Sequence, residues 1–239
     1  MWRQVRCKKL SLAAPLGRPD VSVGVAKAAS DLLGVYAGLA ERGAHLLGDL
    51  LAGAPPVQWE RLPDADAVDS AGRYQWFYHS HAPEDRTSDS EHGHIHLFAR
   101  RAIWEGLSAT PEEGAFRKLC GKPRSNAGTR HLIAIGFDAK GLPISLFAVN
   151  SWVTDDLMLS TDSTVRLLAE IDLDTGHPEI DAMIVSLIRL CQKDIETLLD
   201  ERDRTLASRP PRGVLDDRAL EILAEIPLNL DAKMANLLG

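Results

Sequence analysis

The chain has 239 residues, a mass of 26.1 kDa and a formal net charge of −7, with 27 lysine and arginine residues against 34 aspartate and glutamate residues. This acidic balance argues against a general nucleic-acid-binding protein, whose phosphate contacts need a basic surface. Apolar residues make up 45% and charged residues 26%, which is ordinary for a globular protein and selects no function. The local exception is histidine, because five of the eight histidines lie between residues 79 and 96.

The cysteines and the hydropathy pattern bear on the compartment. Cys7, Cys120 and Cys191 are widely spaced and form no CxxC pair, which argues against a disulfide framework and against a zinc-ribbon site. No run approaches the roughly 20 apolar residues that a membrane-spanning helix needs. We therefore expect a cytoplasmic protein that binds neither a membrane nor nucleic acid. Residues 1–20 are expected to form a flexible N-terminal arm, with a targeting segment as the alternative.

The first half of the chain predicts a helical region followed by a pair of strands. Apolar residues recur at helical spacing over residues 21–52, with a break expected near Gly43, and residues 57–72 are expected to form a loop. The aromatic-rich stretch 73–81 and the alternating stretch 91–98 are typical of β-strands. Because a polar segment joins them, these two strands predict a hairpin with a long loop.

A capped helix and two further strands are expected next. Thr110 can cap a helix, Pro111 suits its first position, and Glu113 completes a capping box. Residues 130–137 and 142–152 read as two strands joined by a turn.

The C-terminal third is expected to be mainly helical. A short helix is predicted to end near Ile171, and the clearest helix runs from Pro178 to about Arg204, where apolar residues form one stripe. Residues 209–213 form a predicted linker, and the tail from Leu215 is expected to be helical.

Together these elements predict an α+β fold in which N- and C-terminal helices cover a four-stranded antiparallel sheet. We expect a flexible arm over residues 1–20, a single α+β domain over 21–205, and a linker with a C-terminal helical tail over 206–239. The tail is expected to pack on the body or on a partner chain. A homodimer formed through the C-terminal helices is therefore one expectation.

The five clustered histidines occupy alternate positions along the two strands of the predicted hairpin. Side chains two residues apart on a strand share a face, so His79 and His81 point the same way, as do His92, His94 and His96. Directly opposed residues of an antiparallel pair have Cβ atoms about 5 Å apart. One register therefore gathers all five imidazoles on one patch, and it pairs Phe77 with Phe98, His79 with His96 and His81 with His94.

A divalent metal ion accounts for such a concentration of imidazoles, since buried rings need hydrogen-bond partners and protonated rings repel one another. His-x-His on a strand delivers two ligands to one ion, and a third ligand from the neighbouring strand leaves a position for water or substrate. The strongest candidate ligands are His81, His94 and His96, followed by His79 and His92. Zinc, iron and copper all suit such a set.

Other polar residues near the hairpin are weaker candidates. Asp89 and Glu91 are expected to be solvated loop charges, with a role as carboxylate ligands as the alternative. His131 on the third strand either extends the site or is a core histidine. Gln75 shares the histidine face, and Asn150 either orients a ligand at the sheet rim or closes its strand.

The sequence His92-Gly-His-Ile-His-Leu-Phe98 resembles the motif of the histidine-triad nucleotide hydrolases and transferases. This resemblance implies that His94 is a nucleophile that takes up a nucleotidyl group, flanked by His92 and His96. The implied chemistry needs no metal ion.

A longer resemblance, from about Trp59 onward, is to an uncharacterised bacterial family, a domain of unknown function. The matching segments are Gly72-Arg-Tyr-Gln-Trp-Phe-Tyr-His-Ser-His81, Glu91-His-Gly-His-Ile-His-Leu-Phe98, His131-Leu-Ile-Ala-Ile135, Gly141-Leu-Pro143 and Asn150-Ser-Trp-Val-Thr154. This resemblance implies a relative without supplying a mechanism.

The leading hypothesis is a metal-binding protein, and as an enzyme a metal-dependent hydrolase or oxygenase acting on a small molecule, with His94 as the catalytic residue. The first alternative is a metal-free nucleotidyl hydrolase or transferase that uses His94. The second is a non-catalytic metal-binding or accessory protein.

Overall fold

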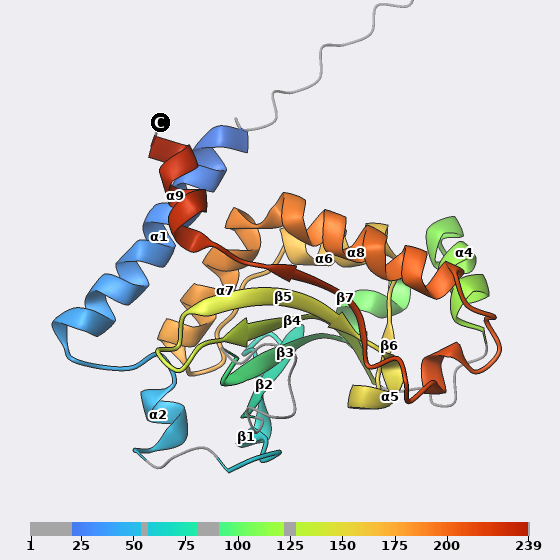
Figure 1. Ribbon diagram of the computed structural model, residues 1–239, viewed down its shortest axis with the longest axis horizontal. Helices are drawn as coiled ribbons and strands as arrows, with labels where there is room; N and C mark the ends of the chain where they lie inside the picture. Colours follow the sequence, from blue (N-terminus) through green and yellow to red (C-terminus); the bar gives the residue numbers. More distant parts are fainter. Residues whose placement is uncertain (1–20, 54–56, 81–90, 122–127, 239) are drawn as a thin grey trace, which may run out of the picture.

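The computed structural model describes residues 21–53, 57–80, 91–121 and 128–238. Its centre is a twisted, mainly antiparallel sheet (Figure 1) with strand order β1-β2-β3-β4-β5-β7, and β6 pairs in parallel with β4. The strands are β1 (Leu62–Val68), β2 (Tyr74–Ser80), β3 (Gly93–Arg100), β4 (Thr129–Phe137), β5 (Pro143–Val149), β6 (Leu157–Met158) and β7 (Ile222–Pro227).

The α+β class is confirmed, but the expectation of four strands is wrong because the sheet has seven strands in the described residues. β1 lies in the stretch expected to be a loop, where Pro63, Asp64 and Asp66 hide the strand signal. An edge strand tolerates such residues because one side of its ladder is free of a partner strand. β7 lies in the tail expected to be helical, and short apolar runs fit either structure.

The helices lie mainly on one side of the sheet (Figure 1). They are α1 (Val21–Glu41), α2 (Gly48–Leu51), α3 (Arg101–Trp104), α4 (Pro111–Cys120), α5 (Ser151–Thr154), α6 (Thr161–Ala169), α7 (Pro178–Leu190), α8 (Gln192–Ala207) and α9 (Leu230–Leu238), with 3-10 turns η2 (Glu105–Leu107) and η3 (Val214–Asp216).

Several helix ends follow the local sequence. α1 stops at Glu41, and Gly43 has the positive φ of 61° that glycine adopts without strain, as the expected break requires. The cap of α4 by Thr110 is confirmed, because Thr110 Oγ1 accepts a hydrogen bond of 3.3 Å from the backbone N–H of Glu113. The expected capping box is wrong, because Glu113 Oε1 accepts from the backbone N–H of Ser160, and the N–H of Thr110 donates to the Leu107 carbonyl. The long helix expected from Pro178 is divided at Cys191 into α7 and α8.

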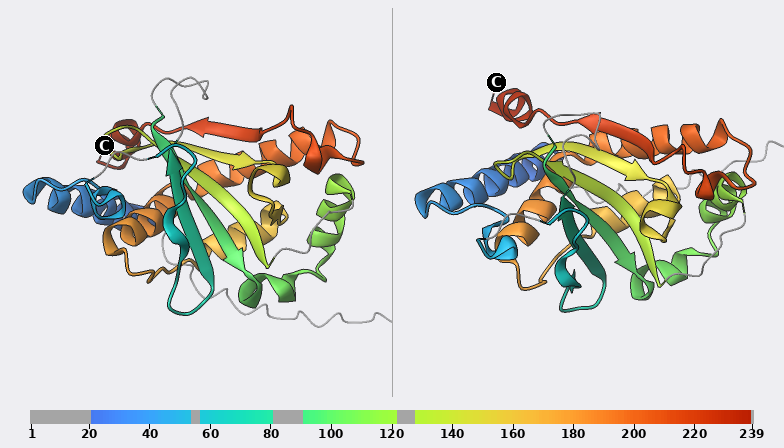
Figure 2. Two further views of the ribbon diagram at one scale, coloured as in Figure 1. Left: turned by 90° about the horizontal axis from the view of Figure 1, so that it is seen from below. Right: turned by 60° about the horizontal axis from the view of Figure 1, so that its bottom comes forward.

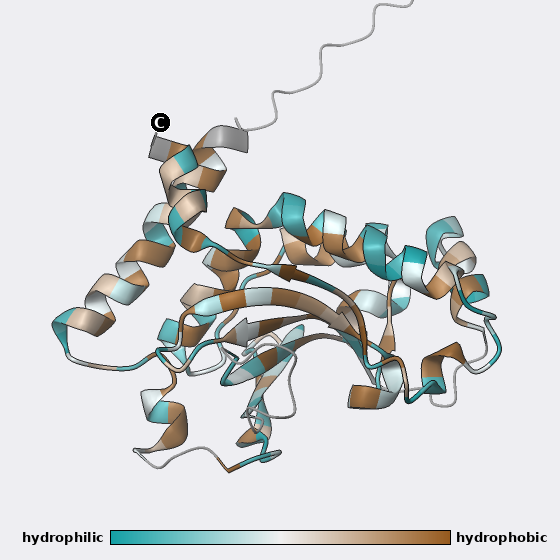
Figure 3. Ribbon diagram, in the orientation of Figure 1, coloured by the Kyte–Doolittle hydropathy of each residue, from teal (hydrophilic) through white to brown (hydrophobic). Residues whose placement is uncertain are grey.

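Helices α6, α7 and α8 cover one face of the sheet, which carries the main apolar core. Trp76 of β2 and Ile95 of β3 are fully buried there. Burying a large apolar side chain stabilises a fold by about 1.5–3 kcal/mol. Two polar tips on this face have fixed partners: Tyr74 Oη donates to the Leu167 carbonyl (2.7 Å), and Trp76 Nε1 donates to Asp181 Oδ1 (3.1 Å). The buried hydroxyl of Tyr78 has no hydrogen-bond partner among the described residues. Figure 3 shows the apolar residues concentrated along the strands and the hydrophilic residues along the outer side of α8.

The N-terminal helix α1 covers the sheet less than expected, because it packs along α7. Leu32 and Leu39 are buried, and Arg42 beyond the helix lies 2.9 Å from Glu179 of α7. By length and composition alone, Val23–Glu41 is apolar enough to cross a membrane, contrary to the sequence-based expectation. A single such helix is weak grounds for a membrane span, because core helices and signal sequences share these properties.

Candidate metal centre

The other face of the sheet carries the histidines. In the pairing of β2 with β3, His79 lies opposite His94 and Phe77 lies opposite His96. The expected pairing of His79 with His96 and of Phe77 with Phe98 is therefore wrong by two residues. A shift of two keeps every side chain on the same face, since side chains alternate along a strand. The alternation along the sequence therefore predicts which face carries the histidines, but it does not distinguish between these two registers of β2 on β3.

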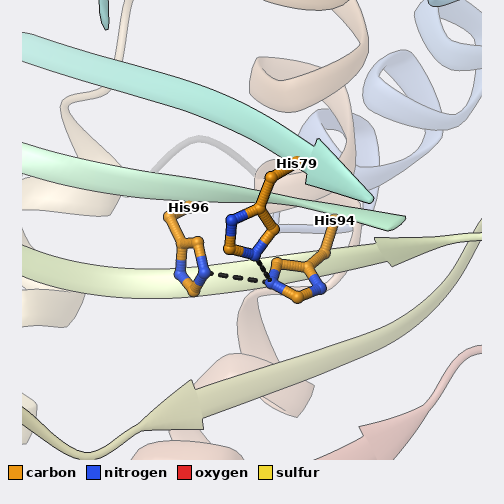
Figure 4. Close-up of side chains that lie close together, drawn as sticks. All are labelled: His79, His94 and His96. Carbon is orange, nitrogen blue, oxygen red and sulfur yellow. Dashed lines mark hydrogen bonds between the residues drawn. The ribbon is translucent and has the colours of Figure 1, made fainter. Parts of the chain in front are cut away.

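Three imidazoles converge on this face (Figure 4). His79 Nε2 lies 2.6 Å from His94 Nε2, which in turn lies 3.0 Å from His96 Nε2. One nitrogen from each of His79, His94 and His96 lies within 4.8 Å of the others, so the group can hold a metal ion. His94 and His96 are buried, and His79 is half-buried.

The carboxylate of Glu91 orients His94. Glu91 Oε1 lies 2.7 Å from His94 Nδ1, and both side chains are buried. The expectation of a solvated loop charge is wrong for Glu91. Gly136 of β4 leaves room for it, because a Cβ at this position would lie 2.9 Å from Glu91 Oε2 and 2.4 Å from Ser145 Oγ. A carboxylate that accepts from Nδ1–H leaves the Nε2 lone pair of His94 facing His79 and His96.

A β-bulge brings a fourth histidine onto this face. Leu97 of β3 lies opposite Ile133 of β4, while Phe98 lies opposite His131, so Leu132 is an extra residue in β4. An extra residue reverses the alternation of side chains. The ring of His131 consequently packs beside Phe98, on the histidine side of the sheet.

His131 can orient His96 as Glu91 orients His94. His131 Nε2 lies 3.0 Å from His96 Nδ1, the ring nitrogen that does not face His94. Burial lowers the pKa of His131 to about 3, and the positive charge of Arg202 adds to this effect. His131 is therefore neutral at pH 7 and can accept a hydrogen bond from His96 Nδ1–H, which leaves His96 Nε2 available as a ligand.

The short distances between ring nitrogens have a clear chemical meaning. With Nδ1–H of His94 donated to Glu91, its Nε2 carries one in-plane lone pair, which can accept one well-directed hydrogen bond. Two nitrogens, from His79 and His96, nevertheless lie within 3.0 Å of it. A cation resolves this competition because it accepts a lone pair from each of the three nitrogens.

A cavity of about 250 Å³ adjoins the three imidazoles. Arg61 and Phe77 both line this cavity, and the guanidinium carbon of Arg61 lies 4.2 Å from the centre of the Phe77 ring. Its remaining lining comes from the segment before β1, the end of β5, helix α5 and the segment before β7, namely Trp59, Val149, Trp152, Val153, Thr154 and Glu221.

The other sequence-derived candidates lie elsewhere. His92 precedes β3, is exposed and does not belong to the converging group, so the expected patch of five imidazoles is not present in the described residues; His81 lies outside them. Gln75 bonds to Asp66 rather than to a histidine. Asn150 is buried, and its Nδ2 donates to the carbonyls of Val214 and Leu220, which makes it a structural residue.

Fold and site together define an α+β protein whose antiparallel sheet carries a three-histidine group able to hold a metal ion. The chain belongs to the family described as "Domain of unknown function (DUF6969)", which matches residues 26–228. No curated protein and no solved structure matches the chain. The matched region includes the converging histidines, Glu91 and His131.

Proposed function

We propose that this protein binds one divalent transition-metal ion through His79, His94 and His96, and that this centre catalyses a reaction of a small molecule. The observation that carries the proposal is that the Nε2 atoms of His79 and His96 both lie within 3.0 Å of Nε2 of His94. The other ring nitrogen of His94 faces Glu91. Buried imidazoles arranged in this way are stabilised when a cation shares their lone pairs.

Three protein ligands leave a coordination position for water, dioxygen or substrate, and the adjoining cavity provides room for it. A metal ion in such a position supplies Lewis acidity or an activated oxygen species, so the reaction class is hydrolytic or oxidative. Zinc, iron and copper all accept three neutral imidazoles.

The residues around the centre have separate tasks in this proposal. Glu91 and His131 hold the rings of His94 and His96, and they keep the proton on Nδ1 of each. Arg61, at the cavity wall, supplies a positive charge for an anionic group of the substrate. His94 has the central place among the three ligands.

We also propose a cytoplasmic location. The free, buried thiols of Cys120 and Cys191 support it, since they form no disulfide with each other. The homodimer expected through the C-terminal helices stays a prediction.

Metal analysis of protein purified without an affinity tag tests the proposal. The wild-type protein is expected to carry about one equivalent of a transition metal, and the double variant His94→Ala/His96→Ala none. His92→Ala is the matched control, because this histidine lies on the same segment but is exposed, and it should retain the metal. His81→Ala, measured in parallel, decides whether the ligand predicted outside the described residues takes part.

A cobalt-substituted protein separates catalysis from storage of the ion. Azide should change the visible absorption spectrum if a coordination position is open. Absence of metal from the wild-type protein, with no affinity for added zinc, iron or copper, would contradict the proposal. Bound metal with a spectrum insensitive to azide would support a closed, non-catalytic centre instead.

A further inference from the structure

The cavity beside the three imidazoles is small, and much of its wall is aromatic. Its volume is about 250 Å³. A cavity of about 150 Å³ with an apolar lining is large enough to hold benzene, so this one has room for a single six-membered ring with a substituent. Apart from the imidazoles, the described wall residues that carry aromatic rings are Trp59, Phe77 and Trp152, and Val149 and Val153 add aliphatic surface.

The two tryptophans reach the cavity from opposite sides of β3 in the strand order. Trp59 lies shortly before β1, which pairs with β2, and Trp152 lies in α5, directly after β5. β3, which carries His94 and His96, lies between these strands. The left view of Figure 2 shows the sheet from below, the side away from α8 in Figure 1. A ligand placed over the imidazoles therefore meets an aromatic side chain from each side.

The fold holds Trp59 with much of its ring exposed. The residue is 59% exposed, and its φ of 66° is a left-handed backbone conformation that bulky residues rarely adopt. Its backbone N–H donates to the Ser80 carbonyl at the end of β2 (3.1 Å), and its ring lies edge-on to that of His79, with the centroids 6.2 Å apart. Strained residues of this kind are concentrated at ligand-binding sites. Trp59 therefore offers a large aromatic surface beside the histidines.

The wall also contains a buried hydroxyl group that lacks a partner in the described part of the chain. Thr154, the last residue of α5, is 7% exposed, and its Oγ1 forms no hydrogen bond to a described residue. A buried polar group without a partner is destabilising, and a hydrogen-bonding group of a bound ligand removes that cost. Thr154 therefore favours a ligand that carries a hydroxyl group.

The charged side chains of the wall do not select a ligand by net charge. Arg61 and Glu221 place one charge of each sign there. Arg61 lies over the Phe77 ring, and its positive charge also acts on the carboxyl group of Asp156, whose pKa it lowers against the larger effect of burial. The aromatic surface and the hydroxyl group of Thr154 are therefore the features that distinguish this cavity.

We propose that the substrate of the histidine centre is a single-ring aromatic compound with a hydroxyl group, of the class of phenols. This inference rests on the proposed function, because it names the small molecule on which that centre acts. The ring packs against Trp59 and Trp152, and the hydroxyl group lies toward Thr154 and the imidazoles. Aromatic rings form favourable edge-to-face and offset-stacked contacts with one another, which a saturated ring does not form. The ionised form of a phenolic hydroxyl is the anionic group that the proposed function assigns to Arg61.

An NMR titration of the zinc-loaded protein with phenol tests this inference, with cyclohexanol and toluene as probes of similar size. Cyclohexanol keeps the hydroxyl group without the aromatic ring, and toluene keeps the aromatic ring without the hydroxyl group. Phenol is expected to bind at one site per chain and about 3–10-fold more tightly than cyclohexanol.

Two variants separate the aromatic surface from the hydroxyl group. Trp59→Ala should weaken the binding of both phenol and toluene by about 3–10-fold, because the ring of the ligand loses its contact. Thr154→Val keeps the shape of the side chain, and it should weaken the binding of phenol by a similar factor while leaving that of toluene unchanged. Thr154→Ser should restore the affinity for phenol.

Each variant has a matched control outside the cavity wall. Val57→Ala replaces another exposed apolar residue of the segment that contains Trp59, and Thr164→Val replaces another buried threonine. Both controls should bind phenol as the wild type does. Trp59→Ala should also leave the melting temperature unchanged, because the residue is exposed, and this guards the test against misfolding.

Equal affinities of the wild type for phenol and cyclohexanol would overturn this inference, and so would unchanged affinity for phenol in Trp59→Ala or in Thr154→Val. The metal content of every sample is measured as well, so that the two proposals fail separately. Zinc-loaded protein without a preference for phenol contradicts the substrate class and leaves the metal centre intact. Protein that binds none of zinc, iron and copper contradicts the proposed function, and this inference is then overturned with it.

Discussion

The two faces of the sheet are equally buried at their centres but opposite in chemistry. On the helix-covered face, Trp76 and Ile95 are 0% exposed, and on the other face His96 is 0% and His94 is 2% exposed. On the first face the polar tips of Tyr74 and Trp76 each have a fixed partner, which is Asp181 for Trp76. The ring nitrogens on the second face converge on one another.

This difference shows that burial alone does not describe a protein interior. Apolar side chains are stabilised by leaving water, and they need nothing further from their neighbours. Buried polar nitrogens lose their hydration and must recover it from partners. The helix-covered face is therefore stabilised mainly by burial, while the proposed metal ion would stabilise the histidine face by sharing the lone pairs of its ring nitrogens. Four predictions test this contrast.

The largest effect is expected on the helix-covered face. Trp76→Ala should lower the free energy of unfolding by about 3–5 kcal/mol, because it removes a fully buried ring and leaves a cavity. Chemical denaturation measures this loss, and it should be the same with and without a chelator. Val68→Ala on β1 is the control, since Val68 is 38% exposed and should change stability by less than about 0.5 kcal/mol. A loss that disappears in the presence of a chelator would show that the two faces are not independent.

Removal of the metal should affect the histidine face alone. With free metal about 100-fold above its dissociation constant, binding stabilises the fold by about 2.7 kcal/mol. A chelator should therefore lower the melting temperature of the wild-type protein by about 5–10 °C. The triple variant His79→Ala/His94→Ala/His96→Ala should melt at the same temperature with or without chelator. An equal decrease in this variant would indicate a metal site elsewhere.

The orienting carboxylate should have a smaller effect that is confined to metal affinity. Glu91→Gln keeps the shape of the side chain but removes the charge that favours the proton on His94 Nδ1. The affinity for zinc should fall by about 10–100-fold in a competition titration. Glu225→Gln, an exposed residue of β7, is the control and should leave the affinity unchanged. Equal affinities of Glu91→Gln and the wild type would remove Glu91 from the centre.

The buried thiols should have no part in metal binding. Burial raises the pKa values of Cys120 and Cys191 to about 12, so both are protonated at pH 8 and are poor ligands. In a Cys7→Ser background, neither thiol should react with a thiol reagent until denaturant is added. The metal content of the protein after this treatment should be unchanged. Rapid reaction in the native state, with release of metal, would place a thiolate at the centre.

The sequence predicts which face of the strands carries the histidines, but it does not predict every residue of the site. The period-two spacing of His79 on one strand and of His94 and His96 on the other predicts their common face, because alternation is a property of every β-strand. Strict alternation along β4 would place His131 on the same face as Ile133 and Ile135, and this prediction is wrong. A bulge at Leu132 reverses its direction, and no local pattern in the sequence marks that bulge.

Glu91 illustrates a different limit. Its position next to a polar stretch favours a solvated loop residue, yet its side chain is buried beside Gly136 of β4 and against His94. The signal that could have revealed it is the glycine in the middle of an otherwise bulky strand, since such a glycine often marks a close approach by another group. That signal shows where space exists but not which residue fills it.

By itself, the sequence determined the α+β class, the capped helix α4, and the common face of the converging histidines, because these depend on residues within a few positions of one another. The tertiary structure decided the register of β2 on β3, the bulge that turns His131 toward His96, the burial of Glu91, and the places of β1 and β7 in the sheet. The physical reason is that each of these depends on contacts between segments far apart along the chain, and alternative pairings with the same local pattern differ only in those contacts.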